Sequence, residues 1–192
     1  MTGTKAVGKL RTLIGRRDLE RRVGQLAVEL GRDLGDRPDS DPLLAVGVLK
    51  GSVFFLADLL KRLTFPVAVD FLQTSSYGGR GTSRGEVRIR KDLDLSIEGR
   101  DVLLVEDIVD SGHTVRAILD LFEFRGAKSV RLCALLDKAA AREVPVPIDY
   151  RGFTIENAFV VGYGLDFDER FRNLPYIAVY EPERKPAVPS PS

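Results

Sequence analysis

Short, wholly apolar runs alternate with segments of helical periodicity along this chain, and this alternation constrains its fold more than any other feature. Residues 102–105 are apolar throughout and are flanked by Asp101 and Glu106, which is typical of a strand covered on both faces. Strands that alternate with helices predict an α/β fold, with a mostly parallel central sheet flanked by helices. The expected strands cover residues 43–49, 67–72, 102–105, 130–136 and 159–161, with 177–180 at the edge of the sheet.

Three segments repeat apolar residues at the spacing of an amphipathic helix. The first covers residues 19–34, the second follows a capping Ser52, and the third covers 115–122 and is closed by Gly126. Residues 73–86 contain four glycines and almost no side chain to bury. That composition predicts a long polar loop or a hairpin.

The length and composition of the chain favour a single domain. Its 192 residues, of which 44% are hydrophobic, are enough for one substantial core. No internal repeat and no Pro/Gly-rich linker divides the sequence into two halves. We therefore expect one domain over residues 16–181, with a flexible tail at 1–15 and a disordered, Pro/Ser-rich tail at 182–192.

Positive and negative charges nearly cancel, with 29 Lys and Arg against 28 Asp and Glu and a net charge of +1. This balance argues against a dedicated nucleic-acid-binding protein, so any anion site must be local. Cys133 is the only cysteine, which excludes a disulfide within the chain and favours a reducing compartment. No apolar run approaches the roughly 18 residues of a membrane helix, and the first residues lack the apolar core of a signal peptide. We expect a cytoplasmic protein that binds neither membrane nor nucleic acid.

The most informative motif covers residues 106–114, after the expected strand 102–105. Its first half holds two adjacent carboxylates, Glu106 and Asp107, which would repel a phosphate. Its second half, 110–114, holds small and hydroxyl-bearing residues at a helix N-terminus, where backbone N–H groups and the helix dipole favour an anion. A ribose 5-phosphate satisfies both halves, because it presents hydroxyls or a hydrated cation to the carboxylates and its phosphate to the loop. For the short string alone, a capped helix after an acidic loop is an equally good interpretation.

The order of a hydrophobic strand, an acidic pair, two apolar residues, an aspartate and Ser-Gly-x-Thr resembles the signature of the type I phosphoribosyltransferases. Further motifs extend this resemblance from about residue 43 to about residue 181, and the chain is similar to the bacterial hypoxanthine and hypoxanthine-guanine phosphoribosyltransferases. The resemblance implies the type I fold, in which the chain ends form a small hood, and a homodimer or homotetramer. It also implies transfer of the ribose phosphate of 5-phosphoribosyl 1-pyrophosphate (PRPP) to hypoxanthine and guanine, with Mg²⁺ as cofactor and pyrophosphate as the second product.

The resemblance assigns a role to each residue of the motif. Glu106 and Asp107 hold the ribose hydroxyls of PRPP, directly and through a magnesium ion. Asp110 lies near N7 of the purine as the catalytic proton acceptor, and its charge stabilises the oxocarbenium character that develops as pyrophosphate leaves. The loop that wraps the 5-phosphate consists of Asp110, Ser111, Gly112, His113 and Thr114.

Residues outside the motif are implied to receive the other groups of the two substrates. A cis peptide precedes the lysine of the pyrophosphate site, and a lid loop excludes water from the reacting centre. Lys138 selects a 6-oxo over a 6-amino base, since an ammonium group has donors only. The implied residues are Lys50, Gly51 and Arg172 for pyrophosphate, Ser76 and Tyr77 for the lid, Lys138, Phe159, Val160 and Asp166 for the purine, and Glu106, Asp107 and Asp166 for metal.

Two alternatives stay open from the sequence. One is an enzyme of the same type that prefers xanthine as its base. The other is a PRPP sensor that binds nucleic acid, although the near-neutral charge argues against it. His113 is expected to contribute only its backbone, and Cys133 is expected to be a small buried hydrophobe.

Overall fold

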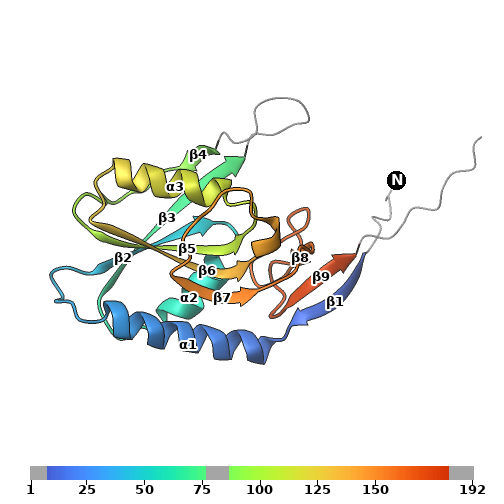
Figure 1. Ribbon diagram of the computed structural model, residues 1–192. Coiled ribbons are helices and arrows are strands. Elements are labelled where there is room, and N and C mark those ends of the chain that lie inside the picture. The colour runs from blue at the N-terminus through green and yellow to red at the C-terminus, as the bar shows by residue number, and fades with distance from the viewer. Residues whose placement is uncertain (1–7, 77–86, 182–192) are drawn as a thin grey trace, which may run out of the picture.

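The computed structural model of the chain describes residues 8–76 and 87–181, which form a six-stranded sheet, a smaller three-stranded sheet and three α-helices (Figure 1). The six-stranded sheet has the order β4-β3-β2-β5-β6-β7, and all of its neighbouring pairs are parallel except β3 with β4. The expected α/β fold with a mostly parallel sheet is therefore confirmed. The strands are β2 (Leu43–Leu49), β3 (Val67–Ser76), β4 (Val87–Lys91), β5 (Asp101–Val109), β6 (Ser129–Asp137) and β7 (Tyr150–Thr154).

Helices cover both faces of this sheet (Figure 1). On one face α1 (Arg16–Leu34) and α2 (Val53–Leu60) pack against Leu103 and Val105, and on the other α3 (His113–Phe124) packs against Val102 and Leu104. Alternate residues of β5 thus face opposite layers, which explains why this strand is apolar without interruption. No helix within the described ranges is both long and apolar enough to span a bilayer.

The three-stranded sheet joins the two ends of the described chain. Its order is β1 (Lys9–Ile14), β9 (Ile177–Glu181) and β8 (Val160–Val161), and both pairings are antiparallel. It lies beyond the carboxyl ends of the parallel strands (Figure 1), as expected of the hood.

Three expectations about these strands were wrong. Residues 9–14, assigned to the flexible tail, form β1, and residues 160–161 and 177–181 belong to the small sheet and not to the central one. Only Ile14 of β1 is buried, so the strand depends on its hydrogen bonds to β9 and carries little apolar pattern of its own. The remaining tail residues, 1–7 and 182–192, lie outside the described residues.

Other local differences concern turns and caps. Residues 73–76, expected in a polar loop or a hairpin, continue β3 and pair antiparallel with β4, as in a hairpin. Ser52 precedes α2 but does not cap it, because its buried hydroxyl donates to the Val48 carbonyl at 2.7 Å. The short β7 was not expected from the sequence. Cys133 is fully buried, as expected.

Candidate active site

Three neighbouring strands of the central sheet end at one place and carry most of the expected site residues. Because β2, β5 and β6 are adjacent and parallel, their carboxyl ends meet at one edge of the sheet. In such sheets this edge is where ligands bind. The residues at these ends are 50–51 after β2, 106–114 at the end of β5, and 137–138 at the end of β6.

The turn between β5 and α3 encloses a small hollow. Its volume is about 80 Å³, and its lining includes Glu106, Asp110, Ser111, Gly112 and Thr114. The structure therefore brings these five expected residues together around one space. Helix N-termini leave backbone N–H groups without an intrahelical partner, so the start of α3 offers donors to an anion in this hollow.

Gly112 is required by the shape of this turn. Its φ is +95°, in the left-handed region that favours glycine, and a Cβ atom here would lie 2.4 Å from the Val144 carbonyl oxygen. His113 does not line the hollow. Its Nε2 lies 3.1 Å from Glu143 Oε2 on the neighbouring loop, consistent with the expectation that only its backbone serves the site.

Glu106 is buried and Asp107 is half-buried at the base of the turn. Burial, followed by the nearby Asp107, raises the pKa of Glu106 well above its ordinary value, and Glu106 Oε2 has no hydrogen-bond partner in the described structure. Burial also raises the pKa of Asp107 to about 6, although the Ile108 N–H and the Arg172 charge oppose that rise. Hydroxyl donors or a cation bound at these two carboxylates would offset the cost of removing their charges from water.

Lys50 and Gly51 lie next to the acidic pair. The Leu49–Lys50 peptide is cis, as the resemblance implies. Gly51 packs so closely on Asp107 that an added Cβ would lie 1.6 Å from Asp107 Oδ2. Gly164 in turn approaches the Gly51 carbonyl oxygen, where an added Cβ would lie 1.9 Å away. Neither Gly51 nor Gly164 therefore has room for a side chain of its own.

Arg172 and Asp166 form an ion pair on the turn that follows β8. Arg172 Nη2 lies 2.9 Å from Asp166 Oδ1, and Arg172 Nη1 donates to the Gly164 carbonyl at 2.8 Å. The same turn brings Glu169 to Lys50, with 3.0 Å between Nζ and Oε2. Glu169 was not among the expected site residues. The only feature of the sequence that could have indicated Glu169 was its position between Asp166 and Arg172.

Lys138 lies beside the candidate catalytic carboxylate. Its side chain is almost fully buried, and Nζ donates to Asp110 Oδ2 at 3.1 Å. Its backbone N–H donates to the Val109 carbonyl at 3.0 Å, which ties the end of β6 to the end of β5. Lys138 and Asp110 were assigned separate roles from the sequence, and the structure brings their charges into contact.

The expected purine-stacking ring lies at the start of β8. The Phe159 ring is half exposed and meets Phe167 edge-on, with ring centres 5.8 Å apart. Val160 is buried and pairs with Val179 of β9, so its side chain packs in the hydrophobic core. Ser76 ends β3 in register with Val87, whereas Tyr77 lies outside the described residues.

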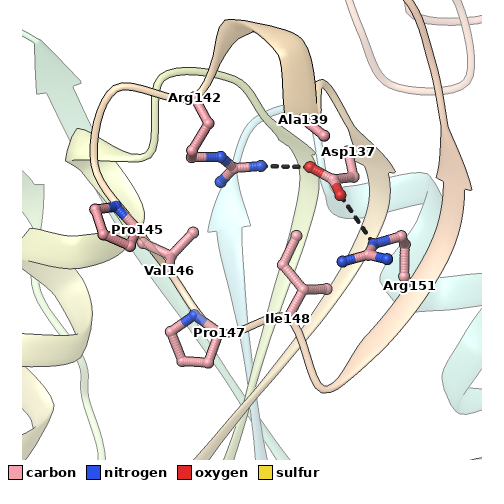
Figure 2. A pocket seen from close by; sticks show the side chains of 8 residues that line it. All are labelled: Asp137, Ala139, Arg142, Pro145, Val146, Pro147, Ile148 and Arg151. Atoms are coloured by element: carbon pink, nitrogen blue, oxygen red, sulfur yellow. Dashed lines mark hydrogen bonds and ion pairs between the residues drawn. The ribbon is translucent and has the colours of Figure 1, made fainter.

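The buried Asp137 carboxylate lies between two arginines, Arg142 and Arg151, at the end of β6 (Figure 2). Asp137, with a side chain 3% exposed, forms ion pairs with Arg142 and with Arg151, the latter at 2.8 Å. These side chains line one wall of a hollow of about 390 Å³. The backbone N–H groups of residues 143 and 144, next to Arg142, both donate to the Ser111 carbonyl. This cluster of Asp137, Arg142 and Arg151 was not expected from the sequence, and the loop that follows Arg142 is hydrogen-bonded to the β5–α3 turn.

Within the described residues, no three His, Cys, Asp or Glu side chains gather closely enough to hold a metal ion by themselves. Glu106, Asp107 and Asp166, the expected metal residues, therefore do not form a complete site of protein ligands.

Comparisons with known proteins show the family to which the chain belongs. The family model described as "Phosphoribosyl transferase domain" matches residues 15–168. The hypoxanthine-guanine phosphoribosyltransferase of Bacillus subtilis is 47% identical over 172 residues, which cover 90% of this chain and 93% of that protein. A crystal structure of a hypoxanthine-guanine phosphoribosyltransferase from Bacillus anthracis superposes with a TM-score of 0.83 at 40% identity, covering 89% of this chain and 99% of that one.

A longer relative shows the same domain in another setting. The bifunctional protein TilS/HprT of Listeria innocua is 54% identical over 155 residues, which cover 81% of this chain but only 24% of that protein. The chain thus spans about a quarter of the length of this relative. On the matched family model, the relatives and the shared fold, the chain belongs to the phosphoribosyltransferase family and, within it, to the hypoxanthine-guanine phosphoribosyltransferases.

Proposed function

We propose that the protein transfers the 5-phosphoribosyl group of PRPP to hypoxanthine and guanine, and so forms IMP and GMP with release of pyrophosphate. The names of its relatives support this activity. The single observation that carries it is the contact between Lys138 and Asp110, 3.1 Å apart at the carboxyl edge of the sheet.

The chemistry of a 6-oxopurine explains why this contact matters. In such a base, O6 and N7 are neighbours on one edge, so a residue that donates to O6 and a residue that meets N7 must lie side by side. A buried ammonium next to a carboxylate has that arrangement. A 6-amino base would present a donor to the Lys138 ammonium, which has no acceptor to offer.

In the proposed reaction, N9 of the base forms a bond to the anomeric carbon of the ribose while the bond from that carbon to the pyrophosphate oxygen breaks. The electron pair leaves with pyrophosphate, and the proton on N7 passes to Asp110. The negative charge of Asp110 also stabilises the positive charge that develops on the ribose. Phe159, which keeps an exposed face, stacks on the base, and the backbone of Val160 reads its edge.

The remaining residues of the site are proposed to hold PRPP. Ser111, Gly112, His113 and Thr114 receive the 5-phosphate at the start of α3, together with Asp110. Lys50, Gly51 and Arg172 receive pyrophosphate, and Ser76 and Tyr77 begin the lid. The hollow inside the β5–α3 turn supports the first assignment.

Mg²⁺ is the proposed cofactor. Glu106 and Asp107 suit a cation, because they are adjacent carboxylates with raised pKa values and the buried Glu106 Oε2 lacks a partner in the described structure. Magnesium binds through one or two carboxylates and completes its shell with water and phosphate oxygens, so a full set of protein ligands is not required. Asp166 is proposed to serve a second ion. When bound, the metal would neutralise charge on the diphosphate.

Action in the cytoplasm as a homodimer or homotetramer, without nucleic acid or membrane as a partner, is also proposed. The near-zero net charge supports the absence of nucleic acid, and symmetric assembly is common among enzymes of this size. Light scattering of the purified protein measures the assembly state.

The test of the activity is a competition assay with purified protein, PRPP, Mg²⁺ and equal amounts of hypoxanthine, guanine and xanthine. Formation of IMP and GMP is the expected result. Preferential formation of xanthosine monophosphate would replace the proposal with a xanthine-preferring enzyme. Consumption of none of the three bases would refute it.

A further inference from the structure

We propose that Glu169 is an internal counter-ion of the pyrophosphate subsite, which the diphosphate of the substrate displaces, and that it limits the affinity of the protein for PRPP and pyrophosphate. The inference rests on the proposed function in one respect, namely that Lys50 and Arg172 receive pyrophosphate.

One carboxylate oxygen joins the two cations of this subsite. Glu169 Oε2 lies 3.0 Å from Lys50 Nζ and 3.3 Å from Arg172 Nη2. An oxygen of a bound diphosphate that bridges both cations would compete for this place. Glu169 is therefore an intramolecular competitor of the diphosphate.

The side chains that have to move are accessible. The Glu169 side chain is 65% exposed and that of Lys50 is 54% exposed. Exposed ion pairs contribute little free energy, because water and salt screen them. A diphosphate with several negative charges can therefore displace a single exposed carboxylate without disrupting the core.

The backbone of the turn holds Glu169 in this place. Asp168, Glu169 and Phe171 have φ values of +53°, +59° and +73°, and Tyr163 has +50°. In the described parts of the chain, these are the only non-glycine residues with positive φ, and such conformations are unfavourable for residues with a Cβ. The Glu169 N–H also donates to Asp166 Oδ2 at 2.9 Å. Three of these residues, Asp168, Glu169 and Phe171, lie in the turn itself, and the hydrogen bond to Asp166 fixes the backbone of Glu169.

Arg172 has partners other than Glu169 that hold its guanidinium in place. Its guanidinium also contacts the Gly164 carbonyl at 2.8 Å and Asp166 Oδ1 at 2.9 Å. The contact with Glu169 is the longest of the three. Glu169 is therefore not needed to orient Arg172, and its main effect on the subsite is to place a negative charge there.

The opposite interpretation, in which Glu169 orients the cations for the substrate, makes the opposite prediction. Loss of an orienting residue weakens binding, whereas loss of a competing charge strengthens it. The sign of the change in affinity therefore separates the two roles.

The test uses Glu169→Gln, which keeps the size and hydrogen-bonding groups of the side chain and removes its charge. Glu123→Gln is the matched control, because Glu123 is exposed near the far end of α3 from the β5–α3 turn. Calorimetric titration with inorganic pyrophosphate and Mg²⁺, at low and high salt, measures affinity without any turnover. Thermal unfolding of each variant checks that the fold is intact.

We expect Glu169→Gln to bind pyrophosphate roughly threefold to tenfold more tightly than the wild type, with a smaller gain at high salt. Glu123→Gln is expected to match the wild type. In kinetic assays, KM for PRPP falls by a similar factor and pyrophosphate becomes a stronger product inhibitor. Unchanged or weaker pyrophosphate binding by a folded Glu169→Gln protein overturns the inference, as does a wild type that binds no pyrophosphate.

This outcome is distinguishable from failure of the proposed function. A protein that transfers no ribose phosphate to a purine can still show tighter pyrophosphate binding in the variant, and the counter-ion role of Glu169 then stands. An active enzyme whose variant binds pyrophosphate no better retains its function and loses this role for Glu169.

Discussion

Lys138 Nζ lies 3.1 Å from Asp110 Oδ2, although 28 positions separate the two residues in the chain. The contact exists because β5 and β6 are parallel neighbours that end together, with Val109 opposite Asp137. It links the residue proposed to select the base with the residue proposed to accept its proton.

Replacement of Asp110 by Asn should lower kcat by about a hundredfold to ten-thousandfold, the usual contribution of a general base. KM for PRPP should change much less, because the proposed role of Asp110 strengthens toward the transition state. Steady-state kinetics of IMP formation measures both constants. Asp39→Asn, an exposed carboxylate before β2, serves as the control, and an unchanged kcat for Asp110→Asn removes Asp110 from the mechanism.

Replacement of Lys138 by Ala should reduce the preference for hypoxanthine over adenine by at least about tenfold in kcat/KM, since the donor to the 6-oxo group is lost. The ratio is the informative quantity, because loss of the partner of Asp110 lowers both rates. Lys128→Ala, which removes an exposed lysine paired with Asp101, should leave the ratio unchanged. A Lys138 variant with full discrimination would show that base selection lies elsewhere.

Replacement of Gly51 by Ala should abolish most PRPP-dependent activity. The new Cβ would lie 1.6 Å from Asp107 Oδ2, so either the acidic pair or the end of β2 has to shift, and displacements of about 1 Å can cost a hundredfold in rate. Gly31→Ala is the control: it lies in α1 with nothing within 4 Å of the added Cβ. It should raise the free energy of unfolding by up to about 1 kcal/mol, with normal activity.

The pKa of Asp107, raised to about 6 mainly by burial, predicts a pH dependence of substrate binding. Because the pKa in the folded protein lies above the ordinary value, this group stabilises the fold at low pH and loses that contribution as pH rises through about 6. Its proposed role requires the ionised form, so kcat/KM for PRPP should fall up to about tenfold per pH unit below 6. Calorimetry at pH 6 in two buffers of different ionisation enthalpy should detect proton release on binding of PRPP with Mg²⁺. Binding without proton release would contradict the assignment.

Replacement of Asp137 by Asn should lower the free energy of unfolding by about 3 kcal/mol, because it leaves the largely buried Arg142 guanidinium without its anionic partner. Asp120→Asn removes a carboxylate that is 62% exposed and paired with Arg116 along α3, and it should cost less than about 1 kcal/mol. Denaturant unfolding of the two variants measures the difference. Equal stability of the two would mean that the Asp137 cluster carries no net stabilisation.

Much of the central sheet could be predicted because its buried strands appear in the sequence as uninterrupted apolar runs. β2 covers residues 43–49, as expected, since a strand covered on both faces must be apolar along its whole length. β1 lacks this signal because most of its side chains are exposed. Its stability depends on hydrogen bonds to β9, about 170 positions later in the chain. The apolar pattern of residues 9–14 does not indicate a pairing partner so far away in the sequence.

The candidate site was predictable only in part, because some of its contacts join residues that are far apart in the sequence. Residues 106–114 form one continuous motif, and the structure gathers most of their side chains around one hollow. Glu169 and the Asp137 cluster were missed because their importance depends on distant partners. Lys50 and Glu169, for example, are 119 positions apart.

The sequence by itself determined the alternation of strands and helices, the motif at residues 106–114 that is proposed to bind phosphate, and the set of charged residues available at the carboxyl edge of the sheet. These follow from local periodicity and turn chemistry, which each segment carries independently of the rest. Only the tertiary structure decided which of those charges meet, namely Lys138 with Asp110 and Glu169 with Lys50 and Arg172. Strand order and the packing of the small sheet bring these side chains together, and both depend on the free energy of the whole fold.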